Sequence, residues 1–173
     1  MHRSTPEEKS EWSSADWAVE GFRFIIDSNF KQGDHYRKGV SYLLSAIIYD
    51  IQEDNYWRAS DLADLTRSLI ELMQDETAEP IVVGIGFEWF GDIDLLLGNE
   101  SAIDHYEQAE PYFKDTDWQD EIWKFEPVFE ISGHILRHHL ESQGYDLPIS
   151  TYTHAERVAR KIELAEEILN DNE

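Results

Sequence analysis

The chain has 173 residues, with 37 Asp and Glu against 14 Lys and Arg, so its formal net charge is -23. Such acidity repels nucleic-acid phosphate and anionic membranes, because both are bound through Lys and Arg, so we expect neither as a direct partner. The absence of Cys excludes disulfides and thiolate metal sites. Hydrophobic residues still make up 41% of the chain, which is enough for one folded domain.

The N-terminal half predicts three helices behind a flexible polar tail at residues 1–12. Ser13 and Asp16 have the spacing of a capping box, which predicts that a helix begins there and that the folded domain spans 13–170. Gly33 is the expected stop of this first helix. Apolar residues at helical spacing then predict two further helices, at 35–53 and 57–75. The tail has no apolar stretch of the kind found in a signal peptide, so we expect a cytoplasmic protein.

The C-terminal half predicts four more helices. Pro80 suits a first helical turn, so a helix is expected over 80–97 with Gly98 as its end, although Ile81–Gly86 is also compatible with a strand. The remaining helices are expected at 100–113, at 117–143 with a kink or break at Pro127, and from the capping box Thr153–Glu156 to about Asn170. The predicted fold class is all-α, with about seven antiparallel helices in a hairpin array or a compact bundle.

Residues 84–113 combine large and small side chains in a pattern that brings two helices close together. Gly91 and Ala102 let the two backbones approach, and Tyr106 fills the space beside Ala109. The positions that carry the pattern are Phe87, Phe90, Gly91, Gly98, Ala102, Tyr106 and Ala109. This segment resembles a tetratricopeptide repeat, with weaker echoes around Ala46 and Gly133. The resemblance implies helical hairpins whose first helices line a protein-binding groove; the alternative is an unrelated helical bundle.

The same resemblance implies which side chains face a ligand. They are Ile85, Glu88, Asp92, Leu95 and Leu96, with Trp89 as a nearby aromatic anchor. Glu88 and Asp92 stand four residues apart on an otherwise apolar helix, where two carboxylates are costly to desolvate without a cation. That cation is either a Lys or Arg of the ligand or an internal Arg, for which Arg23 and Arg67 are the candidates.

A second polar group lies on the predicted sixth helix. Glu130, His134 and His138 recur at four-residue steps, a spacing that can present ligands to zinc. At 100° per residue they share one polar face with Arg137, which would repel a dication, so we expect no metal there. We expect instead a solvated or groove-lining face in which Glu130, His134, Arg137 and His138 bind a partner. His139 lies toward the apolar side and is expected to pack in the core.

No catalytic motif is present, so we expect neither an enzyme nor a cofactor. Lys is scarce, 6 against 8 Arg, and the composition resembles that of proteins from salt-accumulating haloarchaea. The expected function is a salt-adapted protein-interaction module that binds a basic or mixed protein segment in a helical groove. The alternative is an acidic inhibitor, an immunity-type protein or a DNA mimic that blocks its partner through the outer surface. Aromatic residues such as Trp118 and Trp123, on one predicted helix, belong either to the core or to a self-association patch.

Overall fold

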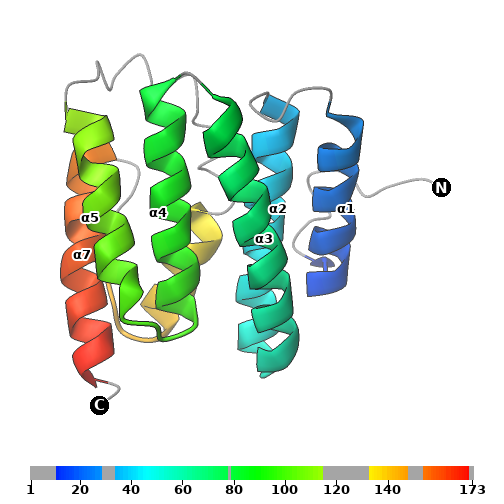
Figure 1. Cartoon of the computed structure of the whole chain (residues 1–173). Coiled ribbons are helices and arrows are strands. Elements are labelled where there is room, and N and C mark those ends of the chain that lie inside the picture. The colour runs from blue at the N-terminus through cyan, green and yellow to red at the C-terminus, as the bar shows by residue number, and fades with distance from the viewer. Residues whose placement is uncertain (1–10, 29–33, 78, 115–132, 148–153, 172–173) are drawn as a thin grey trace.

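The computed structural model describes residues 11–28, 34–77, 79–114, 133–147 and 154–171. Over these residues the protein is all-helical and contains no strand (Figure 1). The labelled helices are α1 (Ser14–Asp27), α2 (Asp34–Gln52), α3 (Tyr56–Glu76), α4 (Pro80–Leu96), α5 (Ser101–Lys114) and α7 (His154–Asp171). A further helical segment spans 133–142. The expectations for Gly33, for residues 117–132 with Pro127, and for the cap at Thr153 lie outside the described residues.

The local signals in the sequence place the helix ends well. Ser13 and Asp16 form the expected capping box, in which the Ser13 amide donates to Asp16 Oδ2 at 2.9 Å and the Asp16 amide donates to Ser13 Oγ at 3.3 Å. Pro80 occupies the first turn of α4, and residues 81–86 are helical, so the strand alternative is wrong. Gly98 ends this helical region with a φ of 75°, a value that glycine adopts at little cost.

Successive helices pack side by side: α1 on α2, α2 on α3, α3 on α4, α4 on α5, and α5 on α7. Smaller contacts of α4 with α2 and α7 make the arrangement a zigzag of two layers. In Figure 1, α3 stands in front of α2, and α5 stands in front of α7. Because α1 and α3 each run antiparallel to α2, they run parallel to each other with α2 behind them (Figure 1).

α4 is the central element of the core. It is buried almost all the way round, with apolar residues such as Ile85, Trp89 and Ile93 at most 1% exposed. The main core also takes residues from α2, α3, α5, α7 and the segment 133–142. A smaller cluster of Trp12, Trp17, Tyr42 and Ala46 lies where α1 packs on α2. None of the helices in the described ranges is long and apolar enough to cross a bilayer.

The hairpin of α4 and α5 depends on close backbone approach. A methyl group built on Gly91 would overlap the buried ring of Tyr106, and one built on Gly84 would lie 2.8 Å from ring carbon Cε1 of Phe113. At the turn, buried Asp94 accepts hydrogen bonds from Arg67 Nη2 on α3 and from Ser101 Oγ on α5. These contacts hold α3, α4 and α5 in one register.

We expect Gly91→Ala to lower the free energy of unfolding by about 1–3 kcal/mol, because overpacking against Tyr106 outweighs the higher helix propensity of Ala. Chemical denaturation measures this loss. Ser60→Ala, at an exposed position of α3, is the control and should change stability by less than about 0.5 kcal/mol. Equal stability of Gly91→Ala and the unmodified protein would contradict the close approach.

Candidate functional site

Two of the three carboxylates of α4, those of Glu88 and Asp92, face the C-terminal helix. Glu88 is 0% exposed and Asp92 is 7% exposed. Opposite them on α7 lie Arg157 and Lys161, which are also separated by four residues and are 5% and 4% exposed. Residues four apart project from one side of a helix, so each helix presents two like charges and the pairs neutralise each other. We call Glu88, Asp92, Arg157, Lys161 and Tyr106 the buried ionic cluster.

Within the cluster, the geometry is that of charge-assisted hydrogen bonds. Arg157 is bidentate on Glu88, with Nε donating to Oε2 at 2.7 Å and Nη2 donating to Oε1 at 2.6 Å. Lys161 Nζ bridges the two carboxylates, at 2.6 Å from Glu88 Oε2 and 2.9 Å from Asp92 Oδ1. The Tyr106 hydroxyl donates to the same Asp92 oxygen at 2.7 Å. The cluster thus joins α4, α5 and α7.

His154 extends the cluster at the start of α7. Its ring stacks on Phe113 with 4.9 Å between centroids. Arg157 Nη2 lies 2.7 Å from His154 Nδ1; since a guanidinium only donates, Nδ1 is the acceptor and the ring is neutral. Burial, assisted by the charge of Arg157, lowers the pKa of His154 from 6.5 to about 3. The charge balance is therefore two carboxylates against two cations.

The two carboxyl groups respond differently to this environment. Burial alone would raise the pKa of Glu88, but Arg157 and Lys161 outweigh it and hold the pKa below its ordinary value. For Asp92, burial is the largest influence and raises the pKa, helped by the charge of Glu88 and opposed by Lys161 and Tyr106. Glu88 is therefore the more firmly ionised of the two.

The expectation that Glu88 and Asp92 need a cation agrees with the structure, but neither proposed internal partner supplies it. Arg67 pairs with Asp94 instead, and Arg23 is an exposed residue of α1. The other implied ligand-facing residues Ile85, Trp89 and Leu95 are at most 5% exposed, and Leu96 is half-buried. These positions face the core, because α7, α5 and α3 cover the sides of α4, so this structure leaves them closed to a ligand.

The polar face on the segment 133–142 is only partly exposed. His134 and Arg137 are half-buried and His138 is exposed, while Glu130 lies outside the described residues. Glu141 lies 3.8 Å from both Arg137 Nε and His138 Nδ1. His139 is buried as expected, its Nδ1 lies 3.2 Å from Gln52 Nε2, and burial lowers its pKa. In the described part of the chain, no three His, Asp or Glu side chains gather to hold a metal ion.

A groove that sequence reasoning missed runs between α1 and α3. It has a volume of ≈ 390 Å³ and an almost wholly apolar surface. Its lining residues are Ser14, Ala15, Ala18, Val19, Phe22, Asp50, Arg58, Asp61, Leu62 and Leu65. Val19 and Leu65 remain 46% and 45% exposed. In the sequence, the apolar residues of α1 and of α3 cover a wider face of each helix than burial against one neighbour requires. The sequence alone does not show that these two faces lie on one side of the fold.

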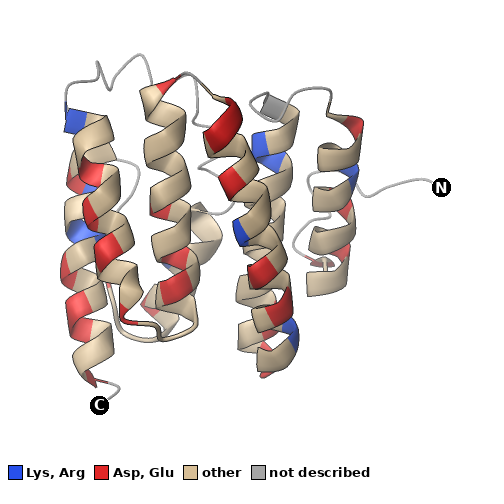
Figure 2. Cartoon of the chain, viewed as in Figure 1, with Lys and Arg blue, Asp and Glu red and all other residues tan. Residues whose placement is uncertain are grey.

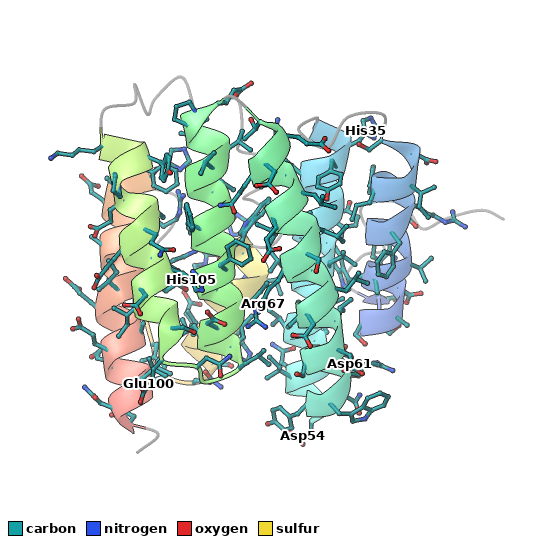
Figure 3. All side chains as sticks on the ribbon, viewed as in Figure 1. His35, Asp54, Asp61, Arg67, Glu100 and His105 are labelled. Atoms are coloured by element: carbon teal, nitrogen blue, oxygen red, sulfur yellow. The ribbon has the colours of Figure 1, made fainter. Side chains whose placement is uncertain are left out.

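Charged groups frame one end of this groove. Buried Asp50 of α2 accepts from Arg58 Nη2 at 2.8 Å, and the same nitrogen donates to Ser14 Oγ at 2.7 Å. Arg58 thus ties α3 to α2 and to the first turn of α1. In Figure 3, Asp61 lies on the side of α3 that faces α1, and Figure 2 shows further acidic residues along both helices. The groove is apolar inside and mainly acidic at its edges.

We expect Glu88→Gln to lower the free energy of unfolding by about 3–5 kcal/mol, because it leaves buried cations without full compensation. Glu107→Gln, which removes the same charge at an exposed position of α5, should cost less than about 0.5 kcal/mol. Urea denaturation of both variants and of Glu88→Gln/Arg157→Gln completes the test. The double variant should lose less than the sum of the single losses, and strict additivity would argue against the pairing.

The lowered pKa of His154 predicts a loss of stability in mild acid. Below pH 6.5 the unfolded chain gains a proton on His154 that the folded protein rejects until about pH 3, so stability falls as pH falls through this window. Between pH 7 and 5 the protein should lose about 2 kcal/mol more than His154→Gln, which has no proton to gain but retains an acceptor for Arg157. Denaturation curves at several pH values measure the difference. Parallel pH profiles would show that His154 is not buried as a neutral group.

Comparison of the chain with models of known protein families, with curated proteins and with solved structures gives no match. The buried ionic cluster and the α1–α3 groove are therefore the features that bear on its function.

Proposed function

We propose that the protein is a non-enzymatic, salt-adapted interaction module that binds a basic or mixed segment of another protein in the groove between α1 and α3. One observation carries the proposal. The large hydrophobic side chains that remain exposed in the described part of the chain all belong to α1 or α3: Val19, Ile26, Tyr56, Trp57, Leu65 and Leu72. Val19 and Leu65 line the groove, and the other four lie on the same two helices, which supports a docking surface on α1 and α3 rather than scattered surface residues.

This proposal places the binding site away from the α4 residues that the tetratricopeptide resemblance implied. The reason is energetic, since Glu88 and Asp92 are already neutralised within the fold. A ligand cation at that place would have to displace Arg157 or Lys161 and strand a buried charge. At the α1–α3 groove, by contrast, apolar surface is already in contact with water, so covering it is favourable at about 25 cal/mol per Å².

The acidic surface supports the rest of the proposal. Carboxylates at the edges attract a basic segment, and they repel nucleic acid and anionic lipid. In concentrated salt the screening length falls to about 3 Å at 1 M, so the apolar groove retains its affinity while long-range charge attraction is lost. The module would therefore bind chiefly through the groove at high salt, with charge selecting the partner at short range.

A displayed library of 16-residue peptides, selected against the protein in molar KCl, tests this function. Selected peptides should bind at least ten-fold more weakly to Val19→Gln/Leu65→Gln, because polar side chains there weaken the apolar contact. Ser60→Gln is the matched control: Ser60 is exposed on roughly the opposite side of α3 from Leu65, and binding should not change.

Peptides that bind the groove variant as tightly as the unmodified protein would place the site elsewhere and overturn the proposal. A second selection in 0.1 M KCl tests the alternative: peptides from it that bind the groove variant equally well and are released at 1 M salt favour the acidic-inhibitor function, because that function depends on charge at the outer surface.

A further inference from the structure

The exposed apolar residues of α1 and α3 share one spacing, which begins in the groove. Val19 and Leu65 line the groove, and seven residues beyond them on the same helices lie Ile26 and Leu72; all four are 41–79% exposed. Seven residues are two helical turns, or about 10.5 Å, so each helix presents two exposed apolar side chains on one face at the same interval. The two helices are parallel with α2 behind them (Figure 1). This is the shape that receives a third helix whose own apolar residues recur at the same interval.

The charge on α1 and α3 determines which kind of helix can bind between them. α1 and α3 together carry eight carboxylates, in Asp16, Glu20, Asp27, Asp61, Asp64, Glu71, Asp75 and Glu76, against the three arginines Arg23, Arg58 and Arg67. Figure 2 shows this excess along both helices. A second copy of the chain, with its net charge of -23, would bring more carboxylates to these edges. The same repulsion disfavours residues 115–132 of this chain, which contain six Asp and Glu and one Lys. A helix with basic flanks is complementary.

The direction of the occupant follows from the ends of the groove. The N-termini of α1 and α3 lie together where Arg58 bonds Ser14, and this end has a positive helix-dipole potential. The opposite end has the helix C-termini with Asp27 and Glu76, so it is negative. A helix that lies antiparallel to both walls puts its negative C-terminus at the Arg58 end and its positive N-terminus at the acidic end.

We propose that the ligand of the α1–α3 groove is a basic amphipathic helix of about four turns, bound antiparallel to α1 and α3, with apolar residues seven apart facing Val19, Ile26, Leu65 and Leu72. The length follows from the stretch between Arg58 and Leu72, 14 residues at 1.5 Å each, or about 21 Å. This inference rests on the proposed function, because it specifies the conformation, charge and direction of the ligand of that same site.

Three synthetic 16-residue peptides test the conformation and the charge. The first has a Leu stripe at helical spacing and Lys or Arg elsewhere, the second replaces its cations with Glu, and the third carries two central Pro residues that prevent a helix. The basic helix should bind with a dissociation constant below about 100 μM, and the other two should bind at least ten-fold more weakly. Asp27→Lys/Glu76→Lys should weaken the basic peptide at least three-fold in 0.15 M salt, whereas Glu107→Lys should not.

The absence of Cys from the chain permits a direct measurement of direction. A spin label on Glu53→Cys, in the α2–α3 turn at the Arg58 end, should broaden the NMR signals of the C-terminal residues of the ¹⁵N-labelled basic peptide. A label on Asp75→Cys, near the other end of α3, should broaden its N-terminal residues. Both positions are exposed.

The outcomes distinguish a failure of this inference from a failure of the proposed function. If selected peptides bind the groove as Pro-containing extended segments or in the opposite direction, the helix proposal is overturned and the groove function stands. Selected peptides that bind the groove as acidic helices would overturn both, because the proposed function requires a basic or mixed segment. If the basic helix binds equally well to Val19→Gln/Leu65→Gln, both are overturned. Binding that depends on the groove, on helicity and on basic charge, with the expected broadening pattern, supports both.

Discussion

The ion pairing between α4 and α7 is the interaction on which the rest of this structure depends. α4 has its sides covered by neighbouring helices, so the carboxylates of Glu88 and Asp92 are almost wholly removed from water. Two cations from 69 to 73 residues further along the chain neutralise them. Because Arg157 is bidentate and Lys161 bridges both acids, a slip of α7 by one residue would break several short hydrogen bonds together. The cluster therefore sets the register of the C-terminal helix.

Such a cluster contributes specificity more than net stability. Removing four charges from water costs several kcal/mol per ion, and mutual attraction in the interior returns about the same amount. The gain is that alternative packings of α7 leave charge buried without a partner, which is far more costly. Tyr106 links this electrostatic constraint to steric packing, because its hydroxyl bonds Asp92 while its ring lies against Gly91. The α4–α5 hairpin and the α4–α7 register are thus coupled at one residue.

The acidic residues of the chain fall into a buried group and an exposed group. Inside, carboxylates are matched one by one: Glu88 and Asp92 by α7, Asp94 by Arg67, and Asp50 by Arg58. Outside, acid exceeds base along the helices, and these carboxylates act collectively, because a dense negative surface is well solvated and repels other anions. The N-terminal end of the fold differs again, because α1 and α3 share α2 as a support and leave apolar residues between them. That end is where recognition is proposed.

The sequence by itself determined the helices and much of their boundaries, because caps, proline and glycine act within a few residues of where they stand. Ser13 with Asp16, Pro80 and Gly98 are examples. It also determined that Glu88 and Asp92 need a cation and that His139 faces the core, since each of these conclusions needs only the position of a residue on a face of its own helix. Only the tertiary structure decided that Arg157 and Lys161 supply that cation, that Arg67 serves Asp94, and that Val19 and Leu65 border one groove. These facts depend on which helices become neighbours. The periodicity of a single helix shows which of its faces is buried but not which other helix covers that face.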